Sequence, residues 1–307
     1  MTKLDHDYGD LTVVIPAFNE AEGIVPTLRQ ATAALPGAEF IVVDDCSADD
    51  TMGAAAAFPG VRVVRHAFNR GQGAALKTGM RHATRKWVAW FDADNEHRVE
   101  DLQRIYARIR AENLVAVIGQ RTNASASLTR AVGKGLIRLI GRGLKLSAGS
   151  DLNCGLRIFL RDVILGYLEL VPDRFSSSLV STLIMLERGY PIGFEPVTTN
   201  SRIGHSTVRM KDGFEAILQL IRAVLLFAPM RFFLPIGTLV FLLGLVYSVI
   251  LALELGRGVP VAGVFLMLGG ISIIMLGLVA DQISQIRLSR FNDRSMVLTN
   301  PQAEPDQ

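Results

Sequence analysis

Three carboxylates, Asp92, Asp94 and Glu96, stand within five positions, directly after the apolar run WVAWF at 87–91. Like charges this close repel one another unless something cationic compensates them. In an extended segment residues two apart point the same way, and Mg²⁺ is held by one or two carboxylates together with substrate phosphates. The spacing therefore predicts a Mg²⁺ or Mn²⁺ site that bridges these acids to a diphosphate. The alternative is a solvated acidic loop.

A second acidic pair ends another apolar run, FIVVDD at 40–45. Asp44 and Asp45 are placed there to accept hydrogen bonds from a base or a ribose. Asp49 and Asp50 come just before the next predicted helix, where acids act as caps and first-turn charges. A simple turn would be the default for one Asp. Two in tandem, at the same predicted sheet edge as the acidic triplet, favour a binding role.

Two further turns offer backbone N–H groups to a ligand. In VVIPAFNEAEGI a strand stops at Pro16 and a helix starts near Asn19 or Glu20, which leaves N–H groups at the helix start unpaired. In HAFNRGQGAALKTGM glycines permit close backbone approach at a helix start, with basic side chains nearby. This second turn could hold a phosphate, although it lacks the P-loop spacing. For both turns the alternative is an ordinary loop without a ligand. The residues of the second turn are Arg70, Gly71, Gly73 and Lys77.

The elements that must position these residues alternate along the chain. Short β-type runs occupy 11–15, 40–45, 61–65, 87–92 and 114–119, and segments with helical spacing occupy 21–35, 73–84 and 99–111. Near-continuous apolar strands that alternate with helices predict an α/β fold with a mostly parallel sheet covered on both faces. Ligands bind such sheets beyond the carboxyl ends of the strands, where the acids stand.

Two long apolar runs dominate the last third of the chain, at about 232–253 and 261–280. Each has about 20 residues without a charge, which covers the ~30 Å hydrocarbon core of a bilayer. The sequence therefore predicts a transmembrane hairpin over 231–281 rather than a pair of buried core helices. The amphipathic segment 210–230 is expected to lie in the membrane interface. The alternative for that segment is an ordinary helix packed on the domain.

Basic residues flank the hairpin on both sides, at Arg222, Arg231, Arg287, Arg290 and Arg294. The turn between the two runs carries one Arg and one Glu. The positive-inside bias therefore places both ends of the hairpin in the cytoplasm, together with the α/β domain expected at 11–209. This arrangement is that of a multi-pass protein of the inner or plasma membrane.

The composition excludes several classes of protein. A formal net charge of +3 over 307 residues is too weak to indicate nucleic-acid binding. Two cysteines without a CxxC pair exclude a disulfide framework and a zinc ribbon, and fit a reducing compartment. Residues 1–10 are polar, lack the pattern of a signal peptide and are expected to be flexible. Residues 282–307 are expected to form a basic and then disordered cytoplasmic tail.

Seven motifs follow one another along about residues 11–207. They are VVIPAFNE, VVDDCSADDT, NRGQGAALKTGM, FDADNEH, GQR at 119–121, DLNCGLR at 151–157 and EPVTTNSRIGHS at 195–206. In this order they resemble the motifs of the family-2 glycosyltransferases of the GT-A fold. More closely, they resemble the polyprenyl-phosphate (dolichyl-phosphate-type) hexosyltransferases, and the hairpin matches bacterial members that make lipid-linked sugars.

The resemblance implies a role for each matching position. A metal and diphosphate site is implied at Asp92, Asp94 and Glu96. Acceptor-phosphate binding is implied for Arg121 and Arg130, and a sugar and acceptor side for Asp151 and Arg157, so that the catalytic residues are Asp92, Asp94, Arg121, Arg130, Asp151 and Arg157. A nucleotide site is implied at Pro16, Ala17, Asn19, Glu20, Asp44, Asp45, Asn69, Gly71, Lys77, Asp92, Ala93, Asp94, Arg202 and Ser206.

Four positions depart from the family's pattern without removing a carboxylate. Cys46 replaces the usual Gly, Cys154 a Ser, Glu96 a common Gln, and Thr207 a Lys. Both cysteines are interpreted as small packed residues because neither has an evident base. The histidines beside the site, His97 and His205, are interpreted as hydrogen-bonding partners rather than as groups that transfer protons.

The implied activity is metal-dependent, inverting transfer of a sugar from a UDP- or GDP-linked donor to a polyprenyl monophosphate at the cytoplasmic membrane face. The resemblance also implies a homo-oligomer such as a tetramer. The second pKa of a phosphate monoester is about 6, so this acceptor is nucleophilic without a strong base and suits arginines better than an Asp. Three alternatives stay open. They are a processive polysaccharide synthase, a transferase for a non-polyprenyl acceptor and a non-catalytic membrane scaffold.

Overall fold

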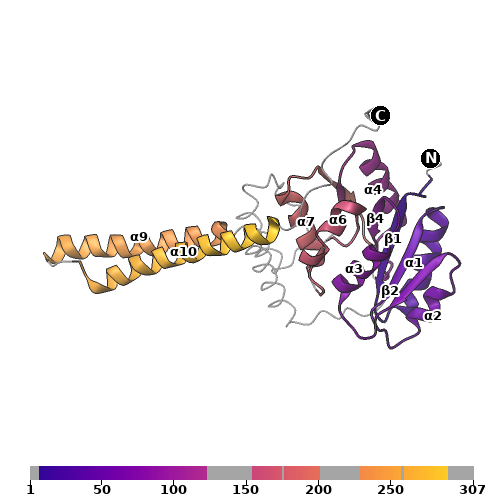
Figure 1. Cartoon of the computed structure of the whole chain (residues 1–307), viewed down its shortest axis with the longest axis horizontal. Coiled ribbons are helices and arrows are strands. Elements are labelled where there is room, and N and C mark those ends of the chain that lie inside the picture. The colour runs from indigo at the N-terminus through magenta and orange to yellow at the C-terminus, as the bar shows by residue number, and fades with distance from the viewer. Residues whose placement is uncertain (1–6, 123–153, 175, 201–228, 257–258, 290–307) are drawn as a thin grey trace, which may run out of the picture. The chain divides into compact units, whose positions relative to one another are not determined.

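The structure is a computed structural model that describes residues 7–122, 154–174, 176–200, 229–256 and 259–289 (Figure 1). These residues fall into two units, an α/β unit up to residue 200 and a hairpin of two helices from residue 229. The predicted interface helix at 210–230 lies outside the described residues except for its last two. Four predicted site residues also lie outside them, namely Arg130, Asp151, Arg202 and Ser206.

The α/β unit is built on a sheet with seven strands among the described residues, in the order β3-β2-β1-β4-β6-β5-β7. The strands are β1 (Leu11–Ala17), β2 (Glu39–Asp44), β3 (Val61–Arg65), β4 (Trp87–Trp90), β5 (Ala116–Arg121), β6 (Arg157–Leu160) and β7 (Ile192–Val197). Neighbours run parallel, except that β6 is antiparallel to both β4 and β5. The predicted mostly parallel sheet is therefore confirmed, and β6 and β7 add to the strands that the sequence indicated.

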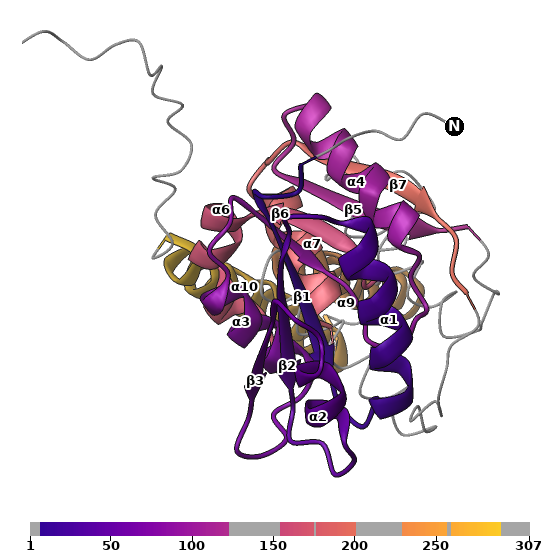
Figure 2. The same ribbon diagram turned by 90° about the vertical axis from the view of Figure 1, so that its right-hand side faces the viewer.

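Helices cover both faces of the sheet, with α1 and α4 on one side and α3 and α6 on the other (Figure 2). The helices are α1 (Ala21–Ala34), α2 (Thr51–Ala56), α3 (Gln72–His82), α4 (Val99–Ala111), α6 (Arg161–Gly166) and α7 (Ser177–Glu187), with the 3₁₀ turn η1 (Leu168–Leu170) before α7. The helices predicted from spacing thus agree with α1, α3 and α4 to within two residues at each end.

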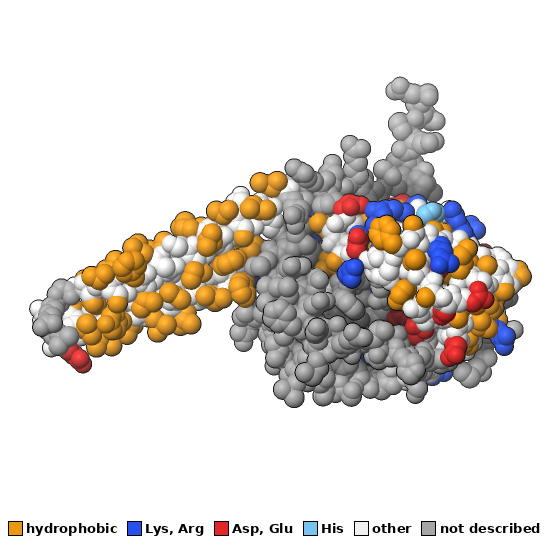
Figure 3. All heavy atoms as spheres, turned by 90° about the horizontal axis from the view of Figure 1, so that it is seen from below, with side chains coloured by type: hydrophobic (Ala, Val, Ile, Leu, Met, Phe, Trp, Pro, Cys, Tyr) orange, Lys and Arg blue, Asp and Glu red, His pale blue; other side chains and the backbone are white. Residues whose placement is uncertain are grey.

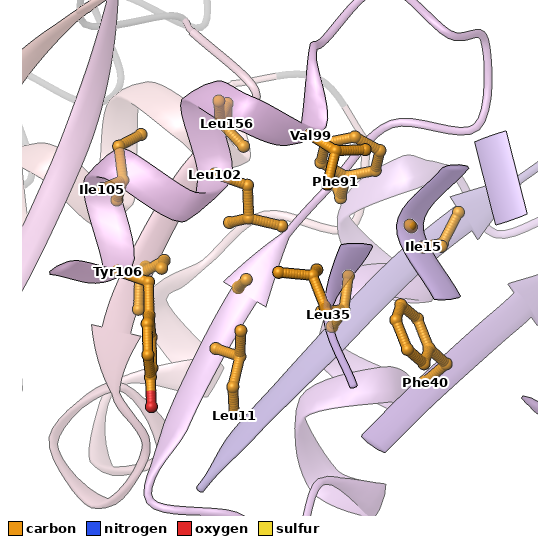
Figure 4. Close-up of a cluster of buried hydrophobic side chains, with 14 of the residues drawn as sticks. Leu11, Ile15, Leu35, Phe40, Phe91, Val99, Leu102, Ile105, Tyr106 and Leu156 are labelled. Carbon is orange, nitrogen blue, oxygen red and sulfur yellow. The ribbon is translucent and has the colours of Figure 1, made fainter. Parts of the chain in front are cut away.

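Strand β1 lies inside the sheet, between β2 and β4, and all of its residues are buried. Its alternate residues point to opposite faces. Leu11 and Ile15 join Leu35, which follows α1, and Leu102 of α4 in one apolar cluster (Figure 4). Burying a side chain of this size contributes about 1.5–3 kcal/mol. The cluster therefore holds α1 and α4 on this face, and burial on both faces explains why β1 is apolar except at Thr12.

Strand β4 ends before its neighbour β1, and this difference opens the carboxyl edge of the sheet. The register pairs Val14 with Trp90, the last residue of β4, and the Phe91 N–H donates to the Val14 carbonyl at 3.1 Å. The backbone groups of residue 16 face the same side as those of residue 14. Pro16 has no N–H to pair and lies where β4 no longer supplies a partner. The chain that carries Asp92 leaves the sheet at this point.

Residues 7–10 belong to the folded unit, although the sequence placed them in a flexible N-terminus. Tyr8 is 3% exposed, and its ring centroid lies 5.0 Å from that of Tyr106 on α4. The Tyr106 hydroxyl donates a hydrogen bond to Asp10. These contacts fix the segment that leads into β1.

The second unit consists of α9 (Pro229–Leu255) and α10 (Val261–Ser289), which pack side by side (Figure 1). Glycines seven residues apart line the contact, with Gly237 and Gly244 on α9 and Gly263, Gly270 and Gly277 on α10. A Cβ atom at Gly270 would lie 2.6 Å from the Gly237 carbonyl oxygen, so the two backbones touch here. Small residues permit this close approach of helices where no aqueous hydrophobic effect drives association.

Both hairpin helices are long and apolar enough to cross a membrane, with candidate spans of 26 residues each at Pro229–Glu254 and Val261–Ile286. Most of their large apolar side chains are exposed and cover the hairpin along its length (Figure 3). An apolar surface of this extent is typical of contact with lipid or another protein. The two predicted runs lie within these spans, and α10 continues beyond the predicted boundary at residue 281.

Candidate active site

A cavity of about 460 Å³ lies beyond the carboxyl ends of β1, β2 and β4. Ten predicted site residues line it, namely Pro16, Ala17, Glu20, Asp45, Asn69, Gly71, Asp92, Ala93, Asp94 and Glu96. Four residues that the sequence analysis did not assign complete the wall, namely Phe18, Gln72, Ala75 and Arg174. The polar strand ends therefore meet in one place, as expected for a parallel sheet.

Asp45 organises the loop between β3 and α3. Its Oδ1 accepts a hydrogen bond from the Arg70 N–H at 2.9 Å, and its Oδ2 accepts one from the Gly71 N–H at 2.7 Å. His66 bridges this carboxylate to α3, with Nδ1 2.7 Å from Asp45 Oδ1 and Nε2 2.9 Å from Thr78 Oγ1. Asp45 is 2% exposed, so these groups compensate for lost water. The carboxylate thereby holds Gly71 at the cavity wall.

Asp44 and Asn19 connect two turns and are not among the residues that line the cavity. Asp44 Oδ1 accepts from the Ser47 N–H at 2.9 Å, and its Oδ2 lies 3.3 Å from Arg65 Nε. Asn19 has a left-handed φ of 54°. Its N–H donates to Ser47 Oγ at 2.9 Å, and its Oδ1 accepts from the Ala48 N–H at 2.8 Å. The turns after β1 and β2 are fixed to each other in this way.

Lys77 binds other parts of the chain and is not among the residues that line the cavity. Its Nζ donates to the Val171 carbonyl at 3.0 Å and forms an ion pair with Asp173. At the same helix start the Ala74 N–H donates to the Asp173 carbonyl at 2.8 Å. Part of the N-terminus of α3, where the sequence suggested a phosphate, is therefore covered by residues 171–174 of this chain.

Asp92 is held from two sides. Its Oδ1 accepts a hydrogen bond from Gln72 Nε2 at 3.0 Å, and its Oδ2 lies 3.3 Å from His97 Nε2. Burial of His97 disfavours the charged imidazolium, but the hydrogen bond and charge of Asp92, with the charges of Glu96 and Asp94, outweigh burial and raise the pKa of His97. The imidazole therefore orients Asp92, which agrees with its interpretation as a hydrogen-bonding partner.

Helix α1 packs directly on the turn that follows Asp92. The Ala93 carbonyl accepts a hydrogen bond from Thr27 Oγ1 at 3.0 Å. A Cβ atom at Gly23 would lie 2.8 Å from the same carbonyl oxygen, so a larger residue would push the turn away. Within the turn, Asp94 Oδ1 accepts from the N–H two residues later at 3.0 Å. These contacts fix the backbone that presents Asp94 to the cavity.

The three carboxylates predicted to bind metal share the cavity wall without forming a closed cage. In the described part of the chain, no three His, Cys, Asp or Glu side chains are close enough together to hold a metal ion. Glu96 Oε1 faces Arg121, at 3.7 Å from its Nη1. Mg²⁺ needs one or two carboxylates where substrate phosphates supply other ligands. Asp92 and Asp94 therefore fit a metal that binds together with a diphosphate.

Arg157, which was expected to shape the sugar and acceptor side, is buried and is not among the residues that line the cavity. Its guanidinium donates to the Ser178 carbonyl at 2.6 Å and to Ser181 Oγ at 3.0 Å. It also lies 5.2 Å from the ring centroid of Trp90. These contacts tie β6 to α7, so that the structure gives Arg157 a role in the fold.

The cavity-wall residues that were not predicted from the sequence differ in whether they lie in a recognisable motif. Phe18 is 44% exposed and Gln72 contacts Asp92, and both stand inside motifs that were singled out. Arg174 belongs to none of the motifs. It reaches the cavity only because the segment before it, residues 171–173, packs on α3. The structure explains why glycine is usual at the position of Cys46, although not why cysteine replaces it. Its φ of 65° is the left-handed conformation that glycine adopts most readily.

Comparison with models of known protein families assigns the chain to a family. The model of Glycosyl transferase family 2 matches residues 12–165, and the model of the GtrB C-terminal hairpin matches residues 228–286. The first match covers half of the chain. The chain therefore belongs to glycosyl transferase family 2. It is a glycosyltransferase with a C-terminal hairpin, as the motifs indicated.

Two similar proteins match along most of their length. The undecaprenyl-phosphate 4-deoxy-4-formamido-L-arabinose transferase of Sodalis glossinidius is 28% identical over 301 residues, which cover 90% of this chain and 89% of that protein. The dodecaprenyl-phosphate galacturonate synthase of Rhizobium johnstonii is 29% identical over 305 residues, which cover 90% and 88%. Both names refer to a prenyl phosphate.

A solved structure confirms the fold. Glucosyl-3-phosphoglycerate synthase from Mycobacterium tuberculosis, in complex with Mn²⁺, uridine diphosphate and glucosyl-3-phosphoglycerate, superposes with a TM-score of 0.56. It is 20% identical, and the match covers 73% of this chain and 83% of that chain. The α/β unit therefore has the GT-A fold that the motifs predicted.

Proposed function

We propose that this chain transfers a sugar from a UDP- or GDP-linked donor to a polyprenyl monophosphate at the cytoplasmic face of a membrane, with inversion at the anomeric carbon and with a divalent metal. The observation that carries the proposal is the single cavity that joins Asp45 and its loop to Asp92 and Asp94. The relatives named for prenyl-phosphate substrates and the apolar hairpin support the lipid acceptor.

The nucleoside occupies the part of the cavity beside Asp45 in this proposal. Phe18 offers an exposed aromatic face there for a base, and stacking on an aromatic face is favourable for every base. The side-chain amide of Asn69, which also lines the cavity, is offered to the ribose and the base. The assay below uses both UDP- and GDP-sugars and so identifies the nucleotide.

The diphosphate lies beside Asp92 and Asp94. Asp92 and Asp94 would hold a divalent metal there, which would supply positive charge to the departing nucleoside diphosphate. Gln72 and His97 hold the two oxygens of Asp92 in place. The protein's contribution at this point is a preorganised carboxylate, so that little reorganisation accompanies the reaction.

The acceptor attacks as an oxyanion. A phosphate monoester is largely dianionic at neutral pH, because its second pKa is about 6, and it needs no strong general base. The site must attract and aim this anion, which Arg121 and the predicted partner Arg130 would do. A single direct displacement inverts the anomeric centre. The hairpin keeps the acceptor's phosphate and the catalytic domain at the same membrane surface.

The test uses the full chain in detergent with undecaprenyl phosphate, Mn²⁺ or Mg²⁺ and a panel of labelled UDP- and GDP-sugars. Label from one donor in the organic phase, lost with EDTA and with Asp94→Asn but kept with the exposed control Asp50→Asn, supports the proposal. Label on a water-soluble acceptor would favour a non-polyprenyl transferase. Absence of both transfer and nucleotide binding would favour a scaffold.

A further inference from the structure

The cavity wall has an unbalanced set of charges. Five of its residues carry carboxylates, namely Glu20, Asp45, Asp92, Asp94 and Glu96. Among the described wall residues one side chain, that of Arg174, is cationic. A diphosphate or a phosphate monoester entering this cavity meets strong negative charge, and the guanidinium of Arg174 is the group of this wall that attracts it.

Arg174 reaches the cavity on a short segment, residues 171–174, which we call the strap. The strap lies on the start of α3, where the Asp173 carbonyl accepts from the Ala74 N–H at 2.8 Å. Lys77 holds it through the Val171 carbonyl and the Asp173 carboxylate. Although burial opposes ionisation of Asp173, its hydrogen bond with Lys77 and the nearby cationic charges lower its pKa.

Glycines make room for the strap. A Cβ atom at Gly71 would lie 2.7 Å from the Asp173 carbonyl oxygen, and a Cβ atom at Gly73 would collide with the Pro172 carbonyl. Gly71, Gly73 and Lys77 of NRGQGAALKTGM therefore share one structural task, because each of them contacts or admits the strap. This arrangement lets Asp173, the residue before Arg174, accept a hydrogen bond from the backbone of α3.

We propose that Arg174 is a substrate-binding residue that binds a phosphate group of the donor or of the acceptor, and that Lys77 and Asp173 are positioning residues that hold it at the cavity. The inference rests on the proposed function. Arginine donates two parallel hydrogen bonds to a phosphate. Anchoring the adjacent backbone lowers the conformational entropy that this exposed side chain loses on binding.

The first experiment measures the dissociation constants of UDP and GDP with Mn²⁺ by calorimetry on the full chain in detergent. Arg174→Gln is compared with Arg62→Gln, which removes the same charge from an exposed position on β3. If the donor's phosphate is bound, Arg174→Gln weakens binding about tenfold, or about 1.4 kcal/mol, and Arg62→Gln leaves it unchanged. Arg174→Lys recovers part of the loss, because it keeps the charge but not the paired donors.

The second experiment measures the KM for undecaprenyl phosphate in the same variants. An increase of about tenfold in Arg174→Gln, with unchanged nucleotide binding, assigns the phosphate to the acceptor. Unchanged nucleotide binding and an unchanged acceptor KM would overturn the inference while leaving the proposed function intact. Failure of the wild-type chain to transfer sugar would instead remove the proposed function.

A double-mutant cycle tests the positioning role. Lys77→Met is expected to raise the same constant that Arg174→Gln raises, either the dissociation constant of the nucleotide or the KM for the acceptor. In the double variant this constant is expected to be no higher than in Arg174→Gln alone, because Lys77 acts through Arg174. The transition temperature of each variant shows whether it is folded. Additive losses in folded variants would contradict the positioning role. Restored binding in the exchanged pair Lys77→Asp with Asp173→Lys would support it.

Discussion

Glu96 Oε1 and Arg121 Nη1 lie 3.7 Å apart, with both side chains largely but not wholly buried at 25% and 22% exposure. Glu96 belongs to the cavity wall, and Arg121 ends β5. The carboxylate therefore offsets part of the positive charge that an anionic acceptor would use. A glutamine at this position would leave that charge available.

We therefore expect Glu96→Gln to lower the KM for undecaprenyl phosphate by up to about fivefold, since pairs of this kind are worth about 0.2–1 kcal/mol. Steady-state kinetics at several salt concentrations measure the effect, which should shrink at high salt. Glu100→Gln, at an exposed site paired with Arg98, is the control. A large increase in the Mn²⁺ concentration needed for activity would instead make Glu96 a metal ligand.

His66 joins Asp45 to α3, and we expect His66→Phe to affect both stability and nucleotide binding. Loss of the two contacts leaves buried polar groups with fewer partners, which costs about 1–3 kcal/mol of unfolding free energy. The dissociation constant of the nucleotide should rise by up to about tenfold. His82→Phe is the matched control, because His82 also contacts Thr78 but through its carbonyl and away from the cavity wall. Equal nucleotide binding in the two variants would contradict the account.

The hairpin offers a neighbouring pair of glycines with opposite surroundings. A Cβ atom at Gly270 would lie 2.6 Å from backbone atoms of α9, whereas nothing lies within 4 Å of one at Gly269. Gly270→Ala should therefore destabilise the hairpin by about 1–3 kcal/mol through overpacking, and Gly269→Ala should not. Thermal denaturation in one detergent compares them. Equal transition temperatures would mean that the helices are not in this register.

Acidification should weaken the strap. The pKa of Asp173 lies below its ordinary value of 3.8 in the folded chain, because its interactions with Lys77 and nearby cations outweigh burial. The ion pair therefore stabilises the fold above the unfolded pKa, and this contribution is lost as pH falls through the lower folded pKa. The difference in transition temperature between the wild type and Asp173→Asn should be constant near neutrality and shrink below about pH 4. A difference that grows on acidification would contradict this sign.

The sequence predicted the parallel sheet and the acidic cavity wall because both depend on local patterns. Apolar runs of four to six residues mark the strands, and parallel strands bring their carboxyl ends to one edge. Asp45, Asp92 and Asp94 could be located from these two facts alone. The hairpin was predictable for the same reason, since length and apolarity are local properties.

Other roles depend on contacts between distant segments and could not be predicted in this way. The four-residue strand β6 does not reveal on which face Arg157 lies, and its burial follows from packing against α7. Lys77 stands beside glycines in a motif that suits a phosphate. Its ammonium group instead donates to the strap, which lies about a hundred residues later in the sequence. Arg174 reaches the cavity through that same long-range contact.

Mass spectrometry of the lipid product distinguishes transfer of a glycosyl group from transfer of a sugar phosphate. Undecaprenyl phosphate is incubated with the full chain, metal and the donor that gives label in the organic phase. The molecular mass of the extracted lipid is then measured. Direct glycosyl transfer gives undecaprenyl phosphate plus the mass of one glycosyl residue, with release of the nucleoside diphosphate. A lipid that gains a sugar phosphate, with release of the nucleoside monophosphate, would contradict the proposed glycosyl transfer.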